Sequence, residues 1–152
     1  MTQLFRKILC PIDFAEHSLA ALEVALQLAQ QNDAALHLLS IAPTPAGAAG
    51  FQPVPMEPYP YVEKDMRQQL DNLARERIPP TTRCETHVVS GDPAERVLAA
   101  ARDLGVDLIV MGTHGRKGLS HLVLGSVAER VVRESPVPVL TTHSTARVRK
   151  IA

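Results

Sequence analysis

The chain has 152 residues, of which 45% are apolar and 3% aromatic, and its formal net charge is zero. A chain of this length is expected to form one domain, over residues 1–152, that buries roughly two thirds of its unfolded surface. Zero net charge and scarce aromatics argue against a nucleic-acid binder, which needs basic and stacking surfaces. No apolar run approaches the ~20 residues of a membrane span, and no signal-peptide pattern begins the chain. We therefore expect a cytoplasmic protein without membrane or nucleic-acid partners.

The first part of the chain alternates apolar runs with a helical pattern. Residues 7–12 predict a strand that is covered on both faces. Its pairing should end near Pro11, which leaves Asp13 at the carboxyl tip. Leucine and alanine at helical spacing predict a helix over 15–31, and the next apolar run predicts a strand over 34–41.

The composition changes between residues 42 and 61, which hold six of the twelve prolines. This segment is predicted to be neither a helix nor a central strand. Long loops in compact domains are often functional. Three roles stay open: a lid over a ligand, a surface insertion, or a polyproline segment for an SH3-type partner.

The alternation then resumes. A helix is predicted over 62–77, a strand over 82–89, and a helix that starts at Asp92 as N-cap and ends at Gly105. Glu95, three residues after Asp92, completes a capping box.

The last elements predicted are a strand over 106–111, a helix over 127–134 and a strand over 136–142. Two prolines in the final strand place it at a sheet edge, because proline cannot donate to the ladder. The tail, 144–152, is expected to fray.

Five strands alternating with four helices predict a doubly wound, five-stranded parallel α/β sheet with helices on both faces. In such sheets ligands bind outside the carboxyl ends of the strands, where the strand order reverses. If the order is 3-2-1-4-5, the reversal lies between the first and fourth strands. Asp13 and Gly112 would then face each other across one crevice.

Two cysteines and two histidines fall inside the predicted strands. Cys10 and Cys84 would be separated by two strand spacings, about 9–10 Å, which is beyond disulfide reach. Two free thiols are therefore predicted. His37 and His87 are expected to be ordinary strand residues.

A glycine-spaced stretch links the fourth strand to the last helix. Gly112, Gly115 and Gly118 follow the strand, and Gly125-Ser126 precedes the helix. Glycines let backbone N–H groups approach a ligand, and a helix start offers unpaired donors and a positive dipole end. The stretch therefore predicts a phosphate cradle for an adenine nucleotide.

Each residue of this cradle also has a purely structural interpretation. Gly112 and Gly115 could simply shape a turn, and Ser126 with Glu129 forms a capping box by itself. Asp13 could cap the first helix instead of contacting the ribose or a magnesium ion that bridges phosphates.

The loop also carries charged and imidazole side chains. Arg116 and Lys117 either neutralise phosphates or face solvent, and His114 either donates to a phosphate or is a turn residue. His114 and His121 are not at a recognised metal-ligand spacing, so no zinc site is expected there.

Together these motifs resemble the universal stress protein family. The spacing Gly112-x2-Gly115-x9-Gly125-Ser126 is similar to the family's nucleotide-binding signature. The runs Ile8–Asp13, Glu16–Ser18, Leu108–Gly115 and Ser135–Val139 also resemble the family, so the resemblance covers nearly the whole chain. The glycine pattern is neither a P-loop nor a dinucleotide fingerprint.

The resemblance implies an ATP- or AMP-binding fold of the adenine nucleotide alpha hydrolase-like type, with strand order 3-2-1-4-5. It places Asp13 near the ribose or phosphates and the backbone of Ile41 near the adenine. One departure is Ala15, where many members carry serine. The residues implied to bind the nucleotide are Pro11, Ile12, Asp13, Ile41, Met111, Gly112, His114, Gly115, Arg116, Gly125, Ser126 and Val127. It also implies homodimers through the last strand, with Val137, Val139 and Leu140 in contact.

The predicted function is an adenine-nucleotide sensor or regulatory module of the stress response, with at most slow ATP hydrolysis. Phosphoryl transfer needs a positioned nucleophile and an electrostatic clamp, and the motifs supply only the cradle and one candidate metal ligand. Two alternatives stay open: an ATP-using adenylating or hydrolytic enzyme, and a dimeric interaction protein whose loop binds no nucleotide.

Overall fold

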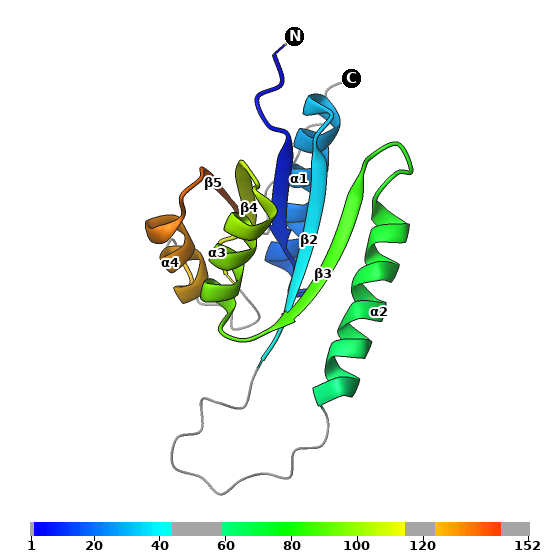
Figure 1. The fold of residues 1–152 in the computed structure, drawn as a ribbon, viewed down its shortest axis with the longest axis vertical. Helices are drawn as coiled ribbons and strands as arrows, with labels where there is room; N and C mark the ends of the chain where they lie inside the picture. Colours follow the sequence, from blue (N-terminus) through cyan, green and yellow to red (C-terminus); the bar gives the residue numbers. More distant parts are fainter. Residues whose placement is uncertain (1, 44–58, 115–123, 144–152) are drawn as a thin grey trace, which may run out of the picture.

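The computed structural model describes residues 2–43, 59–114 and 124–143, and their elements form one parallel sheet with helices on both faces (Figure 1). The strand order is β3-β2-β1-β4-β5, which confirms the prediction. The elements are β1 (Lys7–Pro11), α1 (Glu16–Asn32), β2 (Ala35–Ala42), α2 (Tyr59–Arg77), β3 (Cys84–Ser90), α3 (Pro93–Leu104), β4 (Leu108–Gly112), α4 (Ser126–Glu134) and β5 (Val139–Thr142).

Alternation along the strands divides the apolar side chains between two cores. One core joins α1 and α2 to the sheet, through residues such as Leu22, Leu36 and Leu70. The other joins α3 and α4 to the opposite face, through residues such as Val97 and Ile109. Because successive strand residues point to opposite faces, β1, β2 and β4 contribute to both cores. This arrangement buries the central strands between two layers of helices.

The start and end of α3 follow the predicted signals. The Asp92 carboxylate accepts a hydrogen bond from the backbone N–H of Glu95 at 2.9 Å, so Asp92 is the N-cap. Gly105 ends the helix in the left-handed conformation, with φ 64°. At the end of α1, Asp33 takes the same conformation at φ 50°, although it is not a glycine.

Two predicted boundaries were wrong. Helix α2 begins at Tyr59 and not at residue 62, because a proline at position 60 falls in the first turn, where no N–H is required. Strand β5 begins at Val139, so Pro136 and Pro138 precede it. The carbonyl of Pro138 nevertheless accepts from the Ile109 N–H at 3.0 Å, which aligns the chain for the strand that follows.

No helix among the described ranges is long and apolar enough to cross a membrane. The proline-rich positions 44–58 and the tail 144–152, for which loop and fraying were predicted, lie outside the described residues.

Candidate functional site

The candidate site lies where the strand order reverses. Strands β1 and β4 pair in parallel, with Ile8 opposite Leu108 and Leu9 opposite Ile109. The chain leaves β1 toward β2 and β3 on one side, whereas β4 and β5 lie on the other. The carboxyl ends of β1 and β4, toward the bottom of Figure 1, therefore flank the switch point at which doubly wound sheets bind ligands.

The start of α4 is anchored directly to the end of β4. The Gly125 N–H donates to the Thr113 carbonyl at 2.7 Å, and Gly125 is the N-cap. Among the described residues no side chain caps this helix. The alternative interpretation, a capping box of Ser126 and Glu129, is therefore wrong, because Ser126 is already the first helical residue and is exposed. The first N–H groups of a helix have no partner within it, so this start can accept an anion.

Asp13 begins a short polar turn between β1 and α1. Its carboxylate Oδ1 accepts from the Ala15 N–H at 2.9 Å, while the Asp13 N–H donates to the Ser18 hydroxyl at 3.2 Å. The N-cap of α1 is Ala15, without a side-chain hydrogen bond. One interpretation of the sequence made Asp13 the N-cap of α1, and the structure shows that this interpretation was wrong. Phe14, between Asp13 and Ala15, takes a positive φ of 64°.

Gly112 has a steric role that the sequence did not reveal. A Cβ placed on Gly112 would lie 2.7 Å from the His17 carbonyl carbon and 2.8 Å from its oxygen. The first turn of α1 thus packs directly on the end of β4, and only a residue without a side chain permits that approach. This contact draws the turn that carries Asp13 toward the switch point.

Thr113 is the centre of a polar cluster that sequence reasoning missed. Its hydroxyl lies 3.2 Å from His17 Nδ1, 3.1 Å from His114 Nδ1 and 3.4 Å from His143 Nδ1. The rings of His17 and His114 meet edge to face, with centroids 5.1 Å apart. A hydroxyl donates one hydrogen bond and accepts two, so this cluster requires mixed imidazole tautomers. His114 Nε2 is buried without a hydrogen-bond partner among the described residues.

The other predicted residues fall into two groups. Ile12 and Met111 are buried in the two cores, and the Ile12 N–H donates to Leu39 at 2.8 Å. Ile41 and Val127 pack partly against the α3–α4 core, and Pro11 ends β1. The structure thus gathers the ends of β1 and β4 and the start of α4, and it packs the side chains of Ile12 and Met111 into the cores. Gly115, Arg116, Lys117 and His121 lie outside the described residues.

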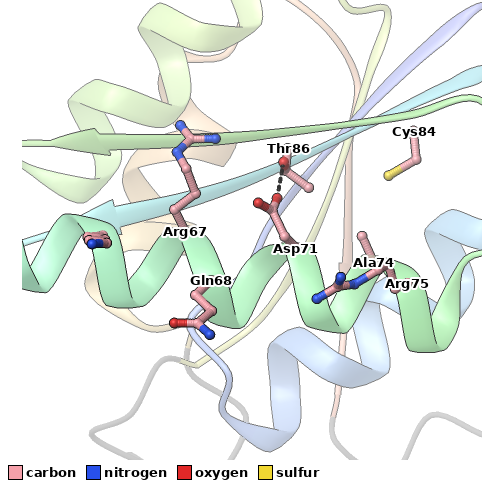
Figure 2. A pocket seen from close by; sticks show the side chains of 8 residues that line it. Arg67, Gln68, Asp71, Ala74, Arg75, Cys84 and Thr86 are labelled. Carbon is pink, nitrogen blue, oxygen red and sulfur yellow. Dashed lines mark hydrogen bonds between the residues drawn. The ribbon is translucent and has the colours of Figure 1, made fainter.

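A hollow of about 690 Å³ lies elsewhere, between α2 and β3 (Figure 2). Within it the Thr86 hydroxyl donates to the Asp71 carboxylate at 2.6 Å. Burial and the charge of Glu85 raise the pKa of Cys84, which also lines the hollow, to about 11. Both cysteines are free thiols, as predicted.

Comparisons with known proteins agree with this architecture. The sequence pattern of the Universal stress protein family matches residues 4–143. Universal stress protein YxiE of Bacillus subtilis is 31% identical, over 90% of this chain and 98% of its own length. The solved structure of MJ0577 from Methanocaldococcus jannaschii superposes with a TM-score of 0.79 at 28% identity, over 98% of this chain and 99% of the other. A universal stress protein crystallised in complex with cAMP shares the fold, with a TM-score of 0.63 at 24% identity, over 93% of this chain and 98% of that one. The chain belongs to the universal stress protein family.

Proposed function

We propose that this protein binds an adenine nucleotide, ATP or AMP, at the switch point and acts as a nucleotide-dependent regulatory module. The observation that carries the proposal is the start of α4, which no described side chain caps and which is tied to the end of β4 by the bond from Gly125 to Thr113. Such a helix start presents backbone donors and a positive dipole end to a phosphate.

Three further features support this assignment. The Nε2 atom of His114 is buried and has no hydrogen-bond partner in the part of the chain that the structure describes, and this residue lies just beyond the end of β4. Asp13 lies at the end of the neighbouring strand, where a carboxylate could hold Mg²⁺ together with phosphate oxygens. The structural neighbour crystallised with cAMP shows that a protein of this fold can hold an adenine nucleotide.

Nucleotide binding would regulate by mass action. A ligand that binds one conformation preferentially stabilises it by RT ln(1 + L/Kd), where L is the ligand concentration, so the stabilisation grows with that concentration relative to Kd. ATP hydrolysis at a slow rate is compatible with this role, whereas steady turnover with pyrophosphate release would instead indicate an adenylating enzyme.

The test is calorimetric titration with ATP, ADP and AMP, with and without Mg²⁺, on two variants of one position. Ser126→Asp adds a negative charge at the first helical residue, and Ser126→Asn has nearly the same shape without the charge. A charge a few ångströms from a phosphate costs about 1–2 kcal/mol at an exposed position, so Ser126→Asp should weaken ATP binding roughly 5- to 30-fold. Ser126→Asn should change it less than about threefold.

Stability provides the control for these variants. An acidic residue in the first turn favours the helix dipole by about 0.3–1 kcal/mol, so Ser126→Asp should unfold no earlier than the parent protein. Weaker binding with undiminished stability would support the phosphate site. Equal ATP affinity in both variants and the parent would refute it.

A homodimer through β5 is a separate part of the proposal. β5 is an edge strand and Leu140 is 36% exposed, but Val137 and Val139 pack against the protein's own core. An open edge can pair with a second copy. Leu140→Lys should then shift sedimentation toward the monomer, and a parent protein that sediments as a monomer at all concentrations would exclude the dimer.

A further inference from the structure

We propose that His37, Glu85 and His87 form a site for one divalent transition-metal ion, of which Zn²⁺ is the best match. The three residues come from two adjacent strands. Glu85 and His87 are two positions apart on the edge strand β3 and so share a face of the sheet. His37 on β2 lies directly across from Glu85 in the parallel register. The site is separate from the switch point and does not depend on nucleotide binding.

The donor atoms are already close to the arrangement that zinc requires. His37 Nδ1 lies 3.0 Å from His87 Nε2, and Glu85 Oε2 lies 3.8 Å from the first nitrogen and 3.9 Å from the second. Tetrahedral zinc with bonds of about 2.0–2.1 Å separates its ligand atoms by about 3.3–3.5 Å. The three observed distances bracket that value, so shifts of a few tenths of an ångström would complete three corners of a tetrahedron.

The surroundings combine a fixed ligand with an open side. The backbone of His37 is paired with that of buried Leu9 on its other side, and His37 is only 5% exposed, so burial limits the movement of its ring. The side chain of His87 is 26% exposed and that of Glu85 is 70% exposed. An ion can therefore enter from solvent, the Glu85 carboxylate can adjust to it, and water can take the fourth position.

The donor set also selects the kind of ion. Two imidazole nitrogens and one carboxylate suit zinc, copper or nickel, whereas Mg²⁺ and Ca²⁺ prefer oxygen ligands throughout. Without a metal, the two nitrogens at 3.0 Å can share one proton as an N–H···N hydrogen bond. Metal binding must displace that proton, so the two arrangements are mutually exclusive and can be distinguished by experiment. A bound ion would tie the edge strand β3 to β2.

The experiment uses the full chain without an affinity tag and titrates it with Co²⁺, whose d–d absorption reports tetrahedral coordination, and then with Zn²⁺ in competition. We expect one equivalent of Co²⁺ to bind with an intense tetrahedral spectrum and Zn²⁺ to displace it. Glu85→Gln and His87→Gln remove one ligand each at partly exposed positions, which protects the fold. Each should weaken binding at least about 100-fold, beyond the loss typical of an outer-shell partner.

His17→Gln is the matched control, because it removes a histidine from the cluster at Thr113. It should leave the cobalt spectrum and affinity unchanged. Circular dichroism verifies that every variant is folded. The proposal is overturned if the parent protein shows no tetrahedral cobalt spectrum, if Glu85→Gln and His87→Gln bind as tightly as the parent, or if only His17→Gln abolishes binding.

Discussion

Gly112→Ala is the substitution that tests most directly how the candidate site is assembled. The added methyl group would lie 2.7 Å from the His17 carbonyl carbon, 2.7 Å from its Cβ and 2.8 Å from its carbonyl oxygen. These separations are several tenths of an ångström below ordinary van der Waals contact. Two of the three atoms are backbone, so no rotamer change can relieve the clash, and α1 must shift away from β4.

The magnitude follows from overpacking. Forcing one extra carbon into a close-packed contact costs about 1–3 kcal/mol, and a backbone obstacle favours the upper half of that range. For a chain of this size, about 2–3 kcal/mol lowers the melting temperature by roughly 4–12 °C. The assay is thermal and urea unfolding without nucleotide, since the effect is steric and needs no ligand.

Gly105→Ala is the matched control. Gly105 has a positive φ of 64°, but no described atom lies within 4 Å of an added Cβ, so backbone strain of about 1 kcal/mol is what opposes alanine there. Gly112→Ala should therefore be the more destabilising of the two, although Gly112 does not need the left-handed conformation. If Gly112→Ala proves as stable as the parent, or less harmful than Gly105→Ala, the close packing of α1 on β4 is incorrect.

Three further predictions concern α3, the buried imidazole and the thiols. Asp92→Ala should cost about 1 kcal/mol in urea unfolding because the Glu95 N–H loses its cap, whereas Asp92→Asn should retain most of that energy. Burial lowers the pKa of His37, so below about pH 6.5 the unfolded chain binds a proton that the native ring resists. With a chelator present, stability should therefore fall by about 1 kcal/mol per pH unit just below pH 6.5, and His37→Gln should flatten that slope; an unchanged slope would contradict it. Burial also raises the pKa of both thiols, to about 11 for Cys84. At pH 7 a thiol reagent should therefore label Cys84 slowly and Cys10 only after unfolding. Rapid labelling of Cys10 in the native protein would refute this.

The sequence predicted most elements because their signals are local. Apolar runs identified the strands, and the cap at Asp92 with the glycine at Gly105 bounded α3 to within a residue. The start of α2 was missed because a proline was taken to exclude a helix, although the first turn of a helix accepts it.

The site was harder to predict because it depends on long-range contacts. The missing side chain of Gly112 was interpreted as making room for a phosphate. The space beside Gly112 instead holds the backbone of His17, which lies more than ninety positions earlier in the chain. The cluster at Thr113 joins histidines from three separate segments, and no spacing could reveal it. The pairing of His37 with His87 depends on the register between β2 and β3, which the alternation of a strand does not specify by itself.

The guanidinium of Arg130 ties α4 to the beginning of α3 in addition to the apolar core that the two helices share. Its Nη1 donates to the Asp92 carboxylate at 3.1 Å and its Nε to Glu134 at 2.8 Å, while Asp92 also caps α3. A helix only nine residues long behaves as a stiff rod. Any tilt imposed at its Gly125 end would therefore strain the Arg130 contact together with the apolar packing that α4 shares with α3. A ligand bound at the start of α4 would thus act on the beginning of α3 through an ion pair as well as through the core.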